Sequence, residues 1–188
     1  MEKNDHHLVL GTLEDYLTGE AITDTHDERY LQTLSRILVE DKGFSKSHIR
    51  RNQPLKVRAG DRLAQIKVGF QIFSGERIAM VIQYAPGSLV TRRLSNLALS
   101  RAVVDYQVPL VVTTNGEDAE VIDGHTGRVL GHGLLAIPGK SALEDHIQGL
   151  GEKGFAPLSQ SVRDKAHRIV HACQVDGACP CDSDVCIL

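Results

Sequence analysis

At 188 residues, with 41% hydrophobic and 24% charged side chains, the chain has the size and composition of one globular domain, which excludes a disordered chain or two full domains. No apolar run is long enough to span a membrane, and the start, MEKNDHH, lacks a signal-peptide pattern, so we expect a cytoplasmic protein without membrane contact. The net charge of −3 hides a segregation, because residues 42–67 carry eight basic side chains and one acidic one, which indicates either a polyanion-binding surface or an ordinary solvated face.

The first expected element is an amphipathic helix. After a polar leader over residues 1–24, Thr25-x-x-Glu28 has the spacing of a capping box, in which the two side chains satisfy free backbone amides at a helix start. Apolar residues then recur at Leu31, Leu34, Ile37 and Leu38. This spacing predicts a helix that ends before Gly43.

Three strands are expected next. Residues 54–58 favour a short strand, and residues 63–73 alternate between apolar and polar side chains as a half-buried strand does. Residues 74–77, Ser-Gly-Glu-Arg, indicate a turn. Residues 78–84 are nearly all apolar, which predicts a central strand that is covered on both faces and pairs with the preceding strand as a hairpin.

The second half of the chain indicates a crossover helix followed by more strands. Residues 89–106 have helical apolar spacing, and residues 108–114 and 119–122 are β-rich runs that end at turn signals. A further short strand at 128–130, a capping box at Ser141-x-x-Glu144 and a helix over 158–172 complete the pattern.

This order, α-β-β-β-α-β-β with a C-terminal helix, predicts an α/β (α+β) fold with a mixed central sheet flanked by helices. We expect the domain to cover residues 25–138, a helical extension to cover 139–172, and a Cys-rich tail to cover 173–188.

Several phrases resemble the N-terminal nuclease-like domain of type I restriction enzyme R subunits, a branch of the PD-(D/E)xK superfamily. They are the Glu early in the first helix, Leu-Val-Glu-Asp-Lys-Gly-Phe at 38–44, and Val-Pro-Leu-Val-Val-Thr-Thr-Asn-Gly at 108–116. The resemblance implies a restriction-endonuclease-like core, DNA and further protein subunits as partners, and Mg²⁺-dependent phosphodiester hydrolysis.

The resemblance also assigns the catalytic positions. Active members join the helix Glu to an Asp on the second hairpin strand and a Glu-x-Lys on the third, because hard oxygen ligands hold Mg²⁺ and the Lys orients the attacking water. Here the helix residue is Glu28, the Asp position holds Gly69, and the Glu-x-Lys positions hold Gln83 and Ala85. The loss of both carboxylates and of the lysine predicts that cleavage is lost.

Three acidic residues have alternative interpretations. The spacing from Thr25 favours a helix-capping role for Glu28 over a catalytic one. Asp61 and Glu76 could replace the missing ligands, which would make the chain an active metal-dependent endodeoxyribonuclease with migrated ligands. Both lie in expected turns, where acidic side chains are usually solvated.

The start of the crossover helix is a candidate phosphate site, because free backbone amides and two guanidinium groups meet there. The expected nucleic-acid-binding residues are Lys67, Ser88, Arg92 and Arg93, with Arg50, Arg51, Lys56, Arg58 and Arg62 as a more diffuse field. The alternative is that Ser88 only caps the helix and that the two arginines are solvated.

All four cysteines lie near the C-terminal end, and candidate zinc ligands are His171, Cys173, Cys179, Cys181 and Cys186. Zinc accepts mixtures of Cys and His, but the spacing differs from paired C-x2-C knuckles. A redox thiol, a local disulfide and a chemically idle tail are the alternatives. The leading hypothesis is therefore a DNA-binding domain that does not cleave; an active nuclease and a metal or redox module remain as rivals.

Overall fold

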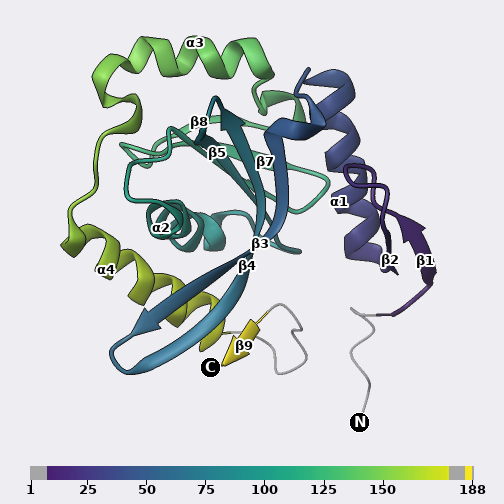
Figure 1. Ribbon diagram of the computed structural model, residues 1–188, viewed down its shortest axis with the longest axis horizontal. Helices are drawn as coiled ribbons and strands as arrows, with labels where there is room; N and C mark the ends of the chain where they lie inside the picture. Colours follow the sequence, from purple (N-terminus) through teal and green to yellow (C-terminus); the bar gives the residue numbers. More distant parts are fainter. Residues whose placement is uncertain (1–7, 178–184, 188) are drawn as a thin grey trace.

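A mixed β-sheet lies between two pairs of helices in the computed structural model, which describes residues 8–177 and 185–187 (Figure 1). The helices are α1 (His26–Arg36), α2 (Arg93–Val103), α3 (Lys140–Leu150) and α4 (Gln160–Val170). One apolar core joins the sheet to α1 and α3 through Leu34, Leu38 and Leu143. A second core joins the opposite face to α2 and α4 through Leu99 and Val170. The predicted α+β class with a flanked mixed sheet is confirmed.

The strands of the main sheet follow one another in chain order. They are β3 (Ile49–Ala59), β4 (Arg62–Ser74), β5 (Arg77–Tyr84), β6 (Leu110–Thr114), β7 (Ala119–Asp123) and β8 (Val129–His132), while β9 (Val185–Ile187) pairs with β4. Neighbours are antiparallel except for β5 and β6, which are parallel and joined through α2. A parallel pair needs such a crossover, because its second strand must start at the same end as the first.

Helix α1 begins where its capping residue predicts. The Thr25 Oγ1 accepts a hydrogen bond of 3.1 Å from the Glu28 amide, and the acidic first turn suits the positive end of the helix dipole. The helix continues as a π-helical turn, Ile37–Asp41, and stops before Gly43, whose φ of 74° no continuing helix allows. The predicted position of this helix is confirmed.

The β4–β5 hairpin forms as its alternating pattern predicts. Ser74 pairs with Arg77 across a turn that contains Gly75 at φ 59°, a conformation that glycine adopts without strain. Residues 78–82 are all buried, because β5 lies between β4 and β6 and both of its faces are covered by helices.

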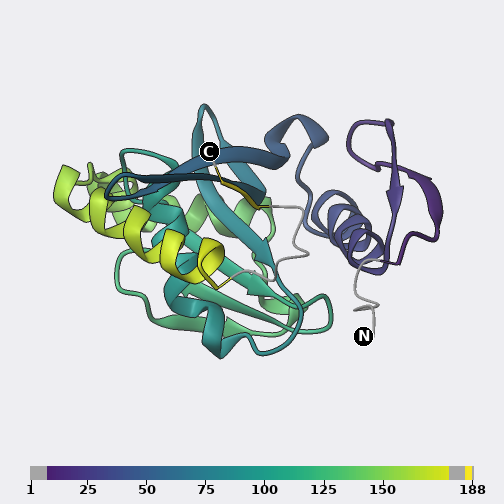
Figure 2. The same cartoon turned by 90° about the horizontal axis from the view of Figure 1, so that it is seen from below.

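Strands β3 and β4 form a ribbon that is longer than the predicted strand at 54–58, because pairing extends from Ile49 to Ala59. Strand β4 contributes side chains to both cores: Phe70 packs on the α1 side, whereas Val68 packs on the α2 and α4 side. The side chains of β4 change from one core to the other at Gly69. Gly69 lies opposite Asn52 in the register, and Asn52 has a φ of 52°. Figure 2 shows α4 running along the distal part of this ribbon.

Other segments differ from the sequence-based expectation. The polar leader contains a two-stranded hairpin, β1 (Gly11–Glu14) and β2 (Ala21–Asp24), on the outer side of α1. Its strands were missed because each has only four residues and little apolar alternation. Helix α3 is capped by Gly139, so Ser141 is not its N-cap as predicted, whereas α4 is capped by Ser159.

Short helical turns occupy Lys46–His48, Val90–Arg92, Leu134–Ala136 and Gly151–Phe155, and a π-helical turn, His171–Val175, follows α4. In the described part of the chain, no helix is both long and apolar enough to cross a lipid bilayer.

Candidate functional site

Gly69 and Gln83 meet where β4 and β5 lie side by side. The Gly69 amide donates a hydrogen bond of 2.8 Å to Gln83 Oε1, and Gln83 Nε2 lies 3.4 Å from the Lys67 carbonyl oxygen. The Gln83 side chain therefore bridges the two strands at the point where their regular pairing ends. A Cβ atom at Gly69 would lie 2.7 Å from the Ile82 carbonyl oxygen, a distance that Cβ atoms essentially never show. The backbone at this position does not accommodate a side chain without moving.

The neighbouring residues of β5 face α1. The Tyr84 hydroxyl donates a hydrogen bond of 2.8 Å to Asp27 Oδ1, and Ile82 lies in the core that contains Leu34 of α1. Successive side chains of a strand point to opposite faces, so Gln83 lies on the face away from α1. Ala85 extends the strand, because its amide donates a hydrogen bond of 3.0 Å to the Thr114 carbonyl oxygen.

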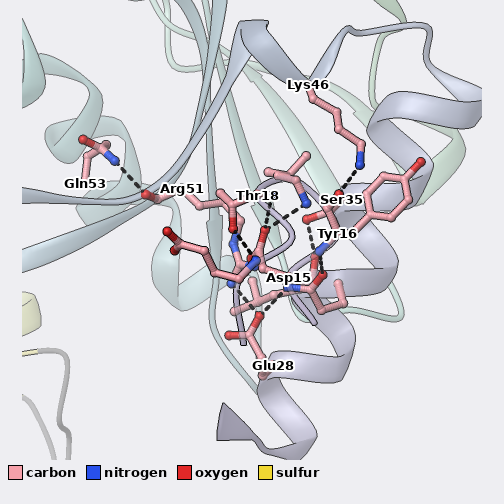
Figure 3. A network of polar contacts seen from close by, with 12 residues as sticks. Asp15, Tyr16, Thr18, Glu28, Ser35, Lys46, Arg51 and Gln53 are labelled. Atoms are coloured by element: carbon pink, nitrogen blue, oxygen red, sulfur yellow. Dashed lines mark hydrogen bonds and ion pairs between the residues drawn. The ribbon is translucent and has the colours of Figure 1, made fainter. Parts of the chain in front are cut away.

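Glu28 is held in a different network, drawn in Figure 3. Its Oε1 accepts hydrogen bonds of 2.7 Å from Arg51 Nη2 and 2.8 Å from Gln32 Nε2. Asp15 Oδ2 accepts from the same two side chains, at 2.6 Å from Arg51 Nη1 and 3.0 Å from Gln32 Nε2. One guanidinium thus bridges a carboxylate of α1 and a carboxylate of the β1–β2 hairpin. The capping box is only half formed, since Thr25 caps the helix while the Glu28 carboxylate bonds elsewhere.

The network is largely buried, because the Arg51 and Asp15 side chains are 7% and 9% exposed. Burial by itself raises the pKa of Asp15, but hydrogen bonds from the Thr18 amide and the Gln32 side chain, together with the charge of Arg51, lower it overall. Two carboxylates then share one buried guanidinium, which is the strong form of an ion pair. Asp15 is not among the residues predicted from the sequence, because nothing in a polar leader marks one aspartate as the partner of a residue far along the chain.

The acidic residues proposed as migrated ligands lie far apart. Asp61 is in the β3–β4 turn and Glu76 is in the β4–β5 turn, so the 13 residues of β4 separate them. An extended strand of that length spans about 40 Å. No single metal ion can bind both side chains, and the migrated-ligand hypothesis is wrong for this pair.

The residues at the family positions do not fit Mg²⁺. Gly69 offers no side chain, Gln83 uses its amide oxygen on the Gly69 backbone, and Glu28 is bound by Arg51. Within residues 8–177, where side chains are described, no group of three or more His, Cys, Asp and Glu side chains is placed to share a metal ion. Mg²⁺ needs carboxylate oxygens in near-octahedral geometry, and this arrangement does not supply them.

The start of the crossover helix holds the predicted phosphate residues in unequal positions. Ser88 is exposed, and its carbonyl oxygen accepts a hydrogen bond from the Thr91 hydroxyl at 2.9 Å. Arg92 is half-buried, whereas Arg93 forms a two-pronged pair with Glu120, with Nε 2.5 Å from Oε2. Glu120 is 4% exposed, and its hydrogen bond with Arg93 lowers its pKa. Binding of DNA by these residues stays a prediction.

The candidate metal ligands of the tail are only partly described. His171 is buried, with its Nδ1 3.5 Å from Asp176 Oδ2, and Cys173 is exposed. Cys179 and Cys181 lie outside the described residues; Cys186 belongs to β9, where the backbone alone is described. The zinc and redox hypotheses stay predictions.

Comparison with known proteins adds one finding to this geometry. Residues 26–138, more than half of the chain, match the family model described as type I restriction enzyme R protein N terminus (HSDR_N). No significant match was found to a curated protein or to a solved structure. The matched segment begins in α1, ends after β8 and contains all four candidate catalytic positions.

Proposed function

Since the chain belongs to the type I restriction enzyme R protein N-terminal family, we propose that it is a DNA-associated domain that binds DNA without cleaving it. Membership of a restriction-enzyme family makes DNA the expected partner, whereas the geometry of the candidate site argues against phosphodiester hydrolysis. Further protein subunits of a restriction enzyme are proposed partners on the same ground.

The observation that carries this proposal is the close approach at Gly69. A carboxylate at this point of the sheet would meet the Ile82 carbonyl oxygen, because the first side-chain atom already lies 2.7 Å from it. The lack of an acidic side chain at Gly69 is therefore built into the local backbone. A single substitution does not restore a ligand there without a shift of β4 against β5.

The Glu28 network supports the same proposal. Glu28 Oε1 accepts from both Arg51 and Gln32, so the cation that balances the charge of this carboxylate is the guanidinium. A Mg²⁺ ion beside Glu28 would be repelled by that neighbouring positive charge. Binding of DNA does not need these residues, because phosphate affinity comes from a positive surface and exposed donors.

A paired assay tests the proposal. The purified chain is incubated with supercoiled plasmid and Mg²⁺ or Mn²⁺, and its binding to a labelled DNA duplex is measured by fluorescence anisotropy at low salt. We expect binding that weakens as salt rises, with no nicked or linear product. Cleavage that is lost in Glu28→Ala would overturn the non-cleaving part. An absence of binding at low salt would overturn the DNA-binding part.

A further inference from the structure

The β3–β4 ribbon presents its positive charges on one face. Across the ribbon, Pro54 pairs with Lys67 and Lys56 pairs with Gln65, so side chains at even positions of β3 and odd positions of β4 share a face. Beyond Asn52 and Gly69, where the side chains of β4 change from one core to the other, the basic residues on this face are Lys56, Arg58 and Lys67, and all three are exposed. We call these three residues the basic ribbon. No acidic residue occurs in either strand.

The opposite face of the ribbon is buried. Val57, Ala64 and Val68 point into the core that α4 closes from below, as Figures 1 and 2 show for the paths of α4 and the ribbon. A face held by a packed helix keeps its shape when it binds, so little entropy is lost in ordering it. The ribbon is therefore a fixed and directional array of cations.

We propose that the basic ribbon is the surface of this chain that contacts nucleic acid, along the sugar–phosphate backbone of a DNA duplex. This inference rests on the proposed DNA-binding function and gives it a location. From Pro54, which lies opposite Lys67, to Arg58 the strand spans about 13 Å, which corresponds to about four base pairs of duplex. The three cations therefore meet neighbouring phosphates.

The ribbon is a better candidate than the start of α2, because two of its cations, Lys56 and Arg58, form no ion pair with a side chain of residues 8–177. Arg93 is bound by the buried carboxylate of Glu120, and that pair cancels its charge toward a ligand.

The chemistry of the face selects the backbone as the contacted part of the DNA. No aromatic residue lies on this face between Pro54 and Arg58 or between Leu63 and Lys67, so it offers no ring on which an unpaired base could stack. It also lacks an exposed large apolar side chain, which a lipid surface would require for insertion. A face with cations but without such side chains is suited to contact phosphates without reading the base sequence.

A matched pair of double variants tests the location. Lys56→Ala with Arg58→Ala removes two charges from the basic ribbon. The control, Arg128→Ala with Lys140→Ala, removes two exposed charges after β7 and at the start of α3. Binding of a labelled duplex of about 30 base pairs is measured by anisotropy over a salt series. We expect the ribbon variant to bind roughly tenfold more weakly, with a salt slope reduced by about two, and the control to match the wild-type chain.

The binding results distinguish a wrong location on the chain from a lack of DNA binding. If the wild-type chain binds the duplex and both double variants bind equally, the location is wrong while DNA binding stands. If the wild-type chain binds no duplex but binds vesicles that contain phosphatidylserine, both proposals fail and the ribbon is a lipid-facing surface. Thermal melting of both variants, which we expect to match the wild-type chain because all four replaced side chains are exposed, separates lost binding from lost folding. Charge reversal by Lys56→Glu, which should weaken binding further than Lys56→Ala, is the second readout.

Discussion

Arg51 Nη1 lies 2.6 Å from Asp15 Oδ2, and this bond ties the β1–β2 hairpin to the edge strand of the main sheet. The same guanidinium reaches Glu28 of α1 at 2.7 Å, so three segments meet at one side chain. Removal of one partner of such a buried pair leaves the other charge buried without compensation.

Arg51→Met is expected to destabilise the domain by about 3–5 kcal/mol, because it leaves two buried carboxylates facing each other. Methionine retains apolar bulk over Phe70, whose ring centroid lies 5.4 Å from the guanidinium carbon. Urea unfolding followed by circular dichroism measures the change. The exposed Arg58→Met is the control and should stay within about 0.5 kcal/mol of the wild-type chain. If Arg51→Met unfolds at the wild-type urea concentration, the network is not a stabilising one.

The depressed pKa of Asp15 predicts a dependence of stability on pH. A carboxyl group whose pKa is lower in the folded state than its unfolded value of 3.8 binds its proton less readily when folded. Its contribution is fully present above the unfolded pKa and is lost as pH falls through the folded pKa. Asp15→Asn should therefore unfold more easily than the wild-type chain near pH 6, and the difference should shrink below about pH 3. A constant difference between these pH values, measured by urea unfolding, would show that the Asp15 charge is not the stabilising feature.

Gly69→Ala is expected to destabilise the chain by about 1–3 kcal/mol, the usual cost of forcing extra atoms into a packed site. The reason is the 2.7 Å approach of a Cβ atom to the Ile82 carbonyl oxygen. Gly149→Ala is the matched control, because a Cβ atom there meets nothing within 4 Å and alanine favours the helix. Thermal melting compares the two variants. Equal melting temperatures would mean that β4 and β5 separate easily at Gly69.

Reconstruction of the family motif follows from the same geometry. The triple variant Gly69→Asp, Gln83→Glu and Ala85→Lys should not nick plasmid in Mg²⁺, because the new Asp is displaced and the Glu28 carboxylate remains bound to Arg51. Incubation with supercoiled plasmid, followed by gel separation of nicked and linear products, measures this result. Nicking by the triple variant that is lost on addition of EDTA would show that only the three side chains were missing.

The sequence predicts the regular parts of this fold because each is encoded locally. Thr25 marks the start of α1, and the apolar run at 78–84 marks a central strand, so short-range spacing was sufficient. The Arg51–Asp15 pair joins residues 36 positions apart, and no local pattern records such a partnership. The same holds for Arg93, which the sequence predicts as a phosphate ligand or a solvated side chain, because no local pattern indicates its pair with Glu120, 27 positions away.

The two arginines at the start of α2 should therefore respond differently to substitution. Arg93→Ala leaves Glu120, a 4% exposed carboxylate, without its two-pronged donor, and should cost about 1–3 kcal/mol, a moderate value because Arg93 is itself partly exposed. Arg92→Ala removes no hydrogen bond of this kind among the described residues and should stay within about 0.5 kcal/mol of the wild-type chain. Urea unfolding measures both, and Glu120→Gln in the Arg93→Ala background should recover part of the loss because it removes the buried charge. If Arg93→Ala retains wild-type stability yet loses DNA affinity, Arg93 is a phosphate ligand and the pair with Glu120 opens when DNA binds.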